Sequence, residues 1–269
     1  MERLPTTVGD PGDTAPWWER RACWLWESVI SGTLVDHDAA EHTAYAVSVQ
    51  QVGSLELPAG LFVAGDPYLI GSDPSPFAQT LPTAQPDVLA IRAEIGPGHN
   101  RIAALVLMCS NAPIASWSMA TAAEEDLDSL EDEGYFGYPV DAGTGSFGNP
   151  EAMGTAHRVL AADAGMLNDP ISTALMADGI GTESAACVAP EDGAEAIAVC
   201  SSGWGDGSYP TWLGLSSDST VVLAVTDFLL TGDPFAKPLA PTAPAPQTAS
   251  APPVPMEGRR PFLKRIFGR

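Results

Sequence analysis

The sequence has few of the residues that build metal centres or disulfide frameworks. Only four cysteines and four histidines occur in 269 residues, no CxxC pair is present, and no histidine lies three to five residues from a cysteine. Zinc sites and disulfide-rich scaffolds depend on such spacings. We therefore expect no zinc site and assign no metal ligands, and we expect the cysteines, most of which adjoin apolar residues, to be buried free thiols.

Lysine is absent from the first 236 residues, which hold 33 acidic residues against six arginines and carry a net charge of −27. The remaining 33 residues carry +5. An acidic body of this kind repels nucleic acid phosphates and anionic membranes. We therefore expect no nucleic acid as a partner of the globular part, and the charge by itself is typical of a protein that stays soluble in the cytosol.

Long apolar segments are also missing. The longest apolar run, Ile102–Cys109, has eight residues, whereas a membrane-spanning helix needs about 20. The first five residues lack the apolar core of a signal peptide. We expect a cytoplasmic protein whose only route to a membrane surface is its basic tail.

The motifs of familiar enzyme classes are absent. The sequence contains no P-loop, no dinucleotide-binding fingerprint, no HExxH and no GxSxG, and each of these marks a specific kind of site. Whether the protein is an enzyme is left open, and no cofactor is indicated.

Composition divides the chain into four parts. Residues 1–16 are rich in Gly, Pro, Asp and Thr and are expected to form a flexible arm, and residues 17–235 are expected to form one globular domain. Residues 236–258 are almost all Pro, Ala, Thr, Ser and Gln, a composition that cannot bury a core and predicts an extended linker. Residues 259–269 are basic and amphipathic.

Within the globular part, alternating apolar residues predict strands that are joined by short turns. No strand–helix rhythm is visible, which favours antiparallel pairing. The predicted fold class is α+β: a β-rich single domain with mostly antiparallel sheets and a few short helices. Strands are expected at 45–49, 55–57, 61–63, 89–95, 102–109, 117–119, 196–200, 211–215 and 221–229, with a hairpin at 55–63.

Helix start signals occur at three places in the middle of the chain. Thr121 and Glu124 have the spacing of a capping box, which predicts an acidic helix through residue 130. Asn149-Pro150 and Asp169-Pro170 each pair an N-cap residue with proline at the first helical position. These pairs predict helices over 150–160 and 170–175.

Four tryptophans fall within residues 17–26, beside Arg20 and Arg21. On a helix, this segment either packs onto the core through its indoles or presents an aromatic docking surface, since Trp and Arg are frequent at binding hot spots. Packing is the favoured interpretation, and the docking surface is the alternative.

Two glycine-rich segments, residues 137–147 and 201–210, are candidates for a ligand site, because such glycines allow positive φ and close backbone approach. The second is interpreted either as a tight hairpin connection with Trp204 and Tyr209 packed down, or as a ligand loop using Asp206. Carboxylates gathered there would hold a divalent cation or act as an acid/base pair. The ligand-loop candidates are Asp66, Gly143, Thr144, Gly203, Trp204, Gly205 and Asp227, and the catalytic candidates are Asp141 and Asp206.

These segments resemble a family of bacterial proteins called domain of unknown function 4241. The resemblance rests on residues 55–60, 64–67, 136–145, 201–210 and 225–228, and it spans roughly residues 40–230. It implies a single domain and no particular activity. Gly148-Asn149 stands where the resemblance would place an acidic residue.

The C-terminal tail predicts a short helix that starts at Pro261 and ends at Gly268. Two turns are too short to be stable alone, so we expect the tail to be disordered until it binds. An anionic membrane, a groove on a partner protein and the chain's own acidic body remain open as docks, and the long linker favours an outward one. Its apolar face comprises Phe262, Leu263, Ile266 and Phe267, and its basic rim comprises Arg259, Arg260, Lys264 and Arg265.

Two function hypotheses follow from these observations. The leading one is a soluble binding or regulatory module whose tail docks on a partner protein or a membrane surface. The alternative is a metal- or acid/base-dependent hydrolase-like enzyme that uses Asp141 and Asp206 at the glycine-rich loops.

Overall fold

The computed structural model describes residues 4–37, 43–131, 134–162, 169–177 and 181–235. The linker expected over residues 236–258 and the tail over 259–269 lie outside these ranges. No helix in the described part of the chain is both long enough and apolar enough to cross a membrane.

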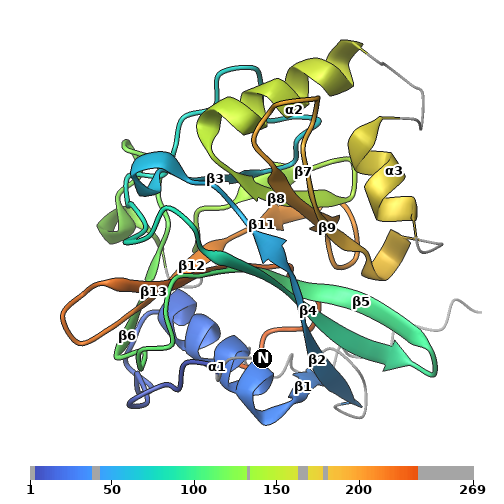
Figure 1. The fold of residues 1–269 in the computed structure, drawn as a ribbon. Coiled ribbons are helices and arrows are strands. Elements are labelled where there is room, and N and C mark those ends of the chain that lie inside the picture. The colour runs from blue at the N-terminus through green and yellow to red at the C-terminus, as the bar shows by residue number, and fades with distance from the viewer. Residues whose placement is uncertain (1–3, 38–42, 132–133, 163–168, 178–180, 236–269) are drawn as a thin grey trace, which may run out of the picture. The chain divides into compact units, whose positions relative to one another are not determined.

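Antiparallel sheets dominate the folded part, as predicted (Figure 1). The large sheet contains, in spatial order, β1 (Thr33–Asp36), β2 (Thr43–Ser54), β4 (Asp87–Gly96), β5 (His99–Met108), β13 (Val221–Asp227), β12 (Thr211–Leu215) and β6 (Ser116–Met119). The small sheet contains β3 (Val63–Gly65), β8 (Thr144–Gly148), β10 (Ile197–Ser201) and β9 (Ala185–Val188). A separate two-stranded ribbon pairs β11 (Gly207–Tyr209) with β7 (Tyr138–Val140).

Helices cover the outer faces of the two sheets. Helix α1 (Trp17–Ser31) packs on the large sheet, and α2 (Pro150–Ala162) and α3 (Pro170–Met176) pack on the small one (Figure 1). Three short 3₁₀ turns complete the elements, namely η1 (Pro58–Gly60), η2 (Leu127–Ser129) and η3 (Gly181–Glu183).

The strand alternation separates three apolar layers. In β4, Leu89 and Ile91 face the layer under α1, whereas Val88 and Ala90 face the layer between the two sheets. In β10, Val199 faces the layer under α2 and α3. Because neighbouring side chains of a strand point to opposite faces, each sheet separates two cores. The β-rich α+β fold class predicted from the sequence is confirmed.

Both N-caps predicted from the sequence form in the structure. Asn149 Oδ1 accepts the amide of Ala152 over 2.8 Å, and Asp169 Oδ1 accepts the amide of Ser172 over 2.8 Å. Both bonds satisfy a backbone donor that a helix start leaves without an intrahelical partner. Helix α1 ends at Gly32, whose φ of 73° is left-handed, as is usual for a glycine that follows a helix.

The acidic helix predicted over residues 121–130 is wrong. Only the η2 turn is helical there. Thr121 is bonded to a distant loop instead: its carbonyl accepts the amide of Ala78 over 2.8 Å and its hydroxyl accepts the side-chain amide of Gln79 over 3.0 Å. Tertiary hydrogen bonds to a distant loop therefore override the local capping pattern.

The hairpin predicted over residues 55–63 is also wrong. Leu55 and Leu57 donate their amides to Pro86 and Ala84, at 3.2 and 2.8 Å. Strand β3 instead pairs with β8 in the small sheet. The Pro58–Gly60 turn therefore carries the chain from one sheet to the other.

Part of the N-terminal arm expected to be flexible lies against the domain. The carbonyl of Thr6 accepts the amide of Ile114 over 2.8 Å, and the amide of Val8 donates to the carbonyl of Ile114 over 2.7 Å. The indole N–H of Trp26 donates to the carbonyl of Pro5 over 2.9 Å. Composition alone did not reveal these contacts.

Candidate functional site

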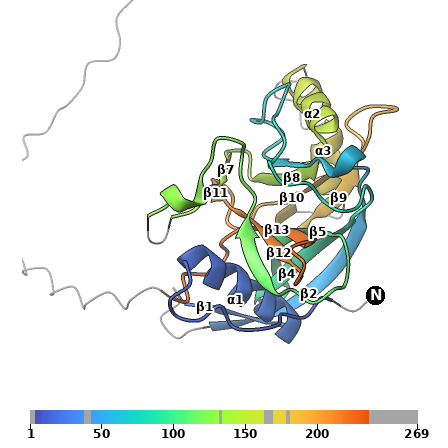
Figure 2. The same cartoon turned by 90° about the vertical axis from the view of Figure 1, so that its left-hand side faces the viewer.

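The two glycine-rich segments lie side by side, although many residues separate them in the sequence. Val140 of β7 lies opposite Gly207 of β11, and the amide of Ser202 donates to the carbonyl of Gly143 over 3.0 Å. Figure 2 shows the two strands next to each other. The second segment leads from β10 in the small sheet to β12 in the large sheet, so the prediction of a simple hairpin connection is wrong.

Three glycines of these loops, Gly143, Gly203 and Gly205, have a positive φ, and that of Gly205 is 113°. Gly203 has a φ of 47°, and a Cβ atom there would lie 2.8 Å from the carbonyl oxygen of Phe228. Gly143 has a φ of 61°, a conformation that other residues adopt only with strain. Thr144 serves the same turn, since its hydroxyl donates to the carbonyl of Ala142 over 3.2 Å. These four candidates therefore shape the loops.

Asp66 anchors the first glycine-rich loop, residues 137–147, through hydrogen bonds to its backbone. It is buried, and its carboxylate accepts the amides of Tyr68, Asp141 and Ala142 at 3.0, 3.0 and 2.8 Å. A carboxylate with three backbone donors is a structural anchor, because its charge is already solvated by the protein. Asp66 is therefore not available to a ligand in this arrangement.

The carboxylate of Asp227 is also engaged in hydrogen bonds within the protein. Its carboxylate pairs with Arg21 of α1, with Nε to Oδ2 at 2.8 Å and Nη2 to Oδ1 at 3.3 Å. It further accepts the indole N–H of Trp212 over 3.4 Å and the amide of Leu229 over 2.8 Å. Both charged groups are buried, so the pair joins α1 to the large sheet.

Asp141 and Asp206 are exposed at the same end of the β7–β11 ribbon. Asp141 follows Val140 and Asp206 precedes Gly207, which form the last pair of the ladder. Among the described residues, no group of three or more His, Cys, Asp or Glu side chains could hold a metal ion. Of the four candidate carboxylates, these two are the ones that face solvent.

Trp204 is exposed but held in place, contrary to the expectation that it packs down. Its side chain is 55% exposed, its indole N–H donates to the carbonyl of Leu230 over 2.8 Å, and the Arg101 guanidinium lies 4.5 Å from its ring centroid. Arg101 also donates to the carbonyl of Gly203 over 2.7 Å. Because its position is fixed before any partner arrives, Trp204 would lose little conformational entropy on binding.

The tryptophan-rich segment packs as the favoured interpretation predicts. Trp26 is fully buried under α1, and Trp17 stacks on Tyr135 at 5.9 Å and meets Trp212 edge-on at 6.3 Å. The indoles of this helix therefore contribute to the core and to its border.

The four cysteines are free thiols. Cys23 and Cys200 are buried, whereas Cys109 and Cys187 are half-buried. Burial raises the pKa of Cys109 to about 12 and that of Cys187 to about 11. A raised pKa disfavours the thiolate, so neither side chain is set up as a nucleophile at neutral pH.

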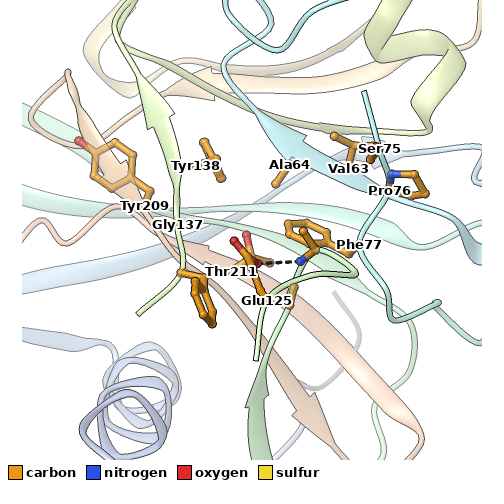
Figure 3. Close-up of a pocket in the computed structure, with 13 residues that line it drawn as sticks. Val63, Ala64, Ser75, Pro76, Phe77, Glu125, Gly137, Tyr138, Tyr209 and Thr211 are labelled. Atoms are coloured by element: carbon orange, nitrogen blue, oxygen red, sulfur yellow. Dashed lines mark hydrogen bonds between the residues drawn. The ribbon is translucent and has the colours of Figure 1, made fainter. Parts of the chain in front are cut away.

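A small pocket lies beside the ribbon, and its residues were not found from the sequence (Figure 3). Its lining includes Tyr138 and Tyr209, which lie opposite each other on β7 and β11. Both tyrosines fall within the glycine-rich segments and could have been proposed. Arg101 and Glu125, by contrast, lie outside any motif, and only the tertiary fold brings them to the site.

One protein family matches the chain by sequence. The profile of the family described as protein of unknown function (DUF4241) matches residues 55–226. This range contains both glycine-rich loops, Asp66 and the pocket residues. No protein with curated annotation and no solved structure matches the chain.

Proposed function

This chain belongs to the DUF4241 family of proteins of unknown function, and on that premise we propose that it is a binding module. Its contact surface would be the one formed by the two glycine-rich loops, with Trp204 as the anchor. Its partner would be a basic segment of another protein.

The exposure of Trp204 is the observation that carries this proposal. Among the large hydrophobic side chains exposed in the described ranges, Trp204 is the one aromatic residue. Trp is among the residues that contribute most to protein interfaces when it is rigid and accessible. The hydrogen bond to Leu230 and the stacked Arg101 supply the rigidity.

Charge supports a basic partner. Residues 1–236 carry a net charge of −27, and Asp141 and Asp206 are exposed in the same two loops. A cationic side chain gains both from the carboxylates and from an indole face, on which it is worth roughly 0.5–2 kcal/mol. Complementary charge also accelerates encounter with the partner.

The test uses a blocked tetra-arginine peptide and a tetra-citrulline peptide of the same length. We expect the full chain to bind the first and not the second, and we expect Trp204→Ala to weaken binding about tenfold or more, as loss of an aromatic hot spot does. Met176→Ala is the matched control, because Met176 is 51% exposed and lies on α3. Equal affinities of the two variants would refute the role of Trp204.

The hydrolase alternative gains no support from the other two candidate carboxylates. Asp66 and Asp227 are buried and fully engaged by backbone amides, an indole N–H and Arg21. The two that remain, Asp141 and Asp206, stand in exposed loops, and no feature of the described residues favours catalysis over binding there.

The C-terminal tail is proposed as a second contact, which docks in a groove of the partner protein. Stable membrane anchoring takes two signals. The tail offers one short amphipathic segment, and the acidic body works against a second one on an anionic surface. A peptide groove can bind the apolar face of Phe262 and Phe267 while the basic rim remains in water.

A further inference from the structure

A small pocket lies between the two sheets, next to the β7–β11 ribbon. Val63 and Ala64 of β3 line it from the small sheet, and Thr211 of β12 lines it from the large sheet. Its volume is about 110 Å³. A cavity of roughly 150 Å³ holds one benzene molecule, so this pocket has room for a group slightly smaller than that.

The lining combines aromatic rings with a single charge. Of its thirteen described lining residues, four are aromatic and one, Glu125, is charged. In Figure 3, Phe77 and Tyr209 lie on opposite sides of Glu125 and Thr211. The four aromatic residues are Phe77, Phe136, Tyr138 and Tyr209.

The carboxylate of Glu125 is only partly used by the protein. Its Oε2 accepts the amide of Ala122 over 2.7 Å, which fixes the side chain at the pocket. No hydrogen bond from the described residues to its Oε1 is present, and the neighbouring hydroxyl of Thr211 is engaged with that of Thr226 at 2.9 Å. The second carboxylate oxygen of Glu125 therefore remains free to accept a hydrogen bond from a ligand.

The two tyrosines line the pocket as uncharged aromatic side chains. The hydroxyl of Tyr209 donates to the carbonyl of Gly205 over 2.8 Å, which directs it away from Glu125. Burial raises the pKa of Tyr138 well above its usual value, and burial together with Asp206 raises the pKa of Tyr209. Neither ring becomes anionic at neutral pH, so the negative charge of the pocket comes from Glu125.

We infer that this pocket binds a primary alkylammonium group, with the ammonium at Glu125 and the alkyl chain between the aromatic rings. Aromatic faces attract cations and also cover apolar methylenes. A guanidinium prefers two acceptor oxygens in a fork, whereas an ammonium is a compact point charge. Because Ala122 already uses one oxygen of Glu125, the geometry favours the ammonium.

This inference does not rest on the surface around Trp204. Trp204 is not among the pocket residues, although Gly137, Tyr138 and Tyr209 belong to the same two glycine-rich segments. Trp204→Ala should therefore leave amine binding unchanged, whereas Glu125→Gln should weaken it. The two proposals can fail separately.

The experiment titrates the full chain, labelled with ¹⁵N, with n-butylammonium chloride and follows amide chemical shifts. We expect saturable shifts at the residues around the pocket, and no such shifts with n-butanol, which has the same size and no charge. Glu125→Gln keeps an acceptor for Ala122 and removes the charge, and we expect it to raise the Kd about tenfold or more. Glu124→Gln is the matched control, since Glu124 is the exposed neighbour and undergoes the same charge change.

Three results would overturn the inference. These are equal binding of n-butanol, equal weakening by Glu124→Gln and Glu125→Gln, or no saturable shift with the amine while the fold remains intact. Phe77→Leu keeps an apolar side chain but removes a ring, and it should weaken the amine more than it weakens any residual n-butanol contact. A blocked tripeptide with a central lysine distinguishes the two possible sources of the alkylammonium group. If the tripeptide binds more tightly than n-butylammonium, the ligand is a lysine side chain of a protein. If it does not, the ligand is a free amine.

Discussion

Removal of the buried Arg21–Asp227 pair should destabilise the domain strongly. Arg21 of α1 makes two hydrogen bonds to Asp227 and a third, from Nη1, to the carbonyl of Gly232 over 3.1 Å. Its guanidinium also lies 4.7 Å from the ring centroid of Trp24. The pair thus joins α1, the large sheet and the segment that follows β13.

The expected magnitude follows from burial. Arg21 and Asp227 are each 1% exposed, so removal of one partner leaves the other charge uncompensated. Such a change costs about 3–5 kcal/mol. A domain has roughly 5–15 kcal/mol of unfolding free energy in total, so we expect Arg21→Met and Asp227→Asn to fold at 25 °C with a large part of their stability lost.

The assay is urea unfolding followed by tryptophan fluorescence, since the chain has seven tryptophans. The double variant Arg21→Met/Asp227→Asn buries no unpaired charge and should lose less than the sum of the single variants, by about 1–3 kcal/mol. Arg158→Met is the control, because Arg158 is exposed, and it should cost under about 1 kcal/mol. Additive single variants, or a loss no larger than that of the control, would refute the reasoning.

Two further predictions concern the first loop and the tail. Asp66→Asn should lower the free energy of unfolding by about 2–3 kcal/mol, because hydrogen bonds to a charged acceptor become bonds to a neutral one. Amide hydrogen exchange should accelerate first at the two loop amides that donate to this carboxylate. Unchanged exchange there would contradict its anchoring role. In flotation with anionic vesicles, we expect the full chain, a chain ending at Asp233 and the variant Phe262→Asp/Phe267→Asp all to stay unbound, because the tail is proposed to dock on protein. Flotation of the full chain alone would instead identify a membrane anchor.

Sequence patterns that act over a few residues predicted the structure well. The N-caps at Asn149 and Asp169 involve neighbours on the chain, so their hydrogen bonds are encoded locally. The strands β4 and β5 were also expected, at 89–95 and 102–109, and they pair across a short turn. The strand alternation further identified which residues face a core.

Patterns whose groups find distant partners gave wrong predictions. Thr121 has the local signature of a capping residue, but Ala78 and Gln79 occupy its hydrogen-bonding groups. Leu57 precedes a turn, but its amide bonds to Ala84. In both cases the competing partner is a loop whose path the local sequence does not specify.

In the candidate site, too, the sequence identified features that depend on neighbouring residues and missed those that depend on distant ones. The glycines and Trp204 were identified from the sequence because they form an unusual local cluster. The roles of the four aspartates were not, since solvent exposure and hydrogen-bond partners separate Asp66 and Asp227 from Asp141 and Asp206. Glu125 was not identified from the sequence, because the aromatic rings that share its pocket come from three other segments.

The sequence by itself determined the charge of the body, the positions of most strands, the helix starts at 150 and 170, and the two flexible-backbone loops. These properties depend on composition, side-chain period and short-range hydrogen bonds, which the chain carries wherever it folds. Only the tertiary structure decided which carboxylates are buried, which tryptophan is exposed, and which rings surround Glu125. Those outcomes depend on pairing between strands far apart in sequence, where each buried charge must find a partner that no local pattern names.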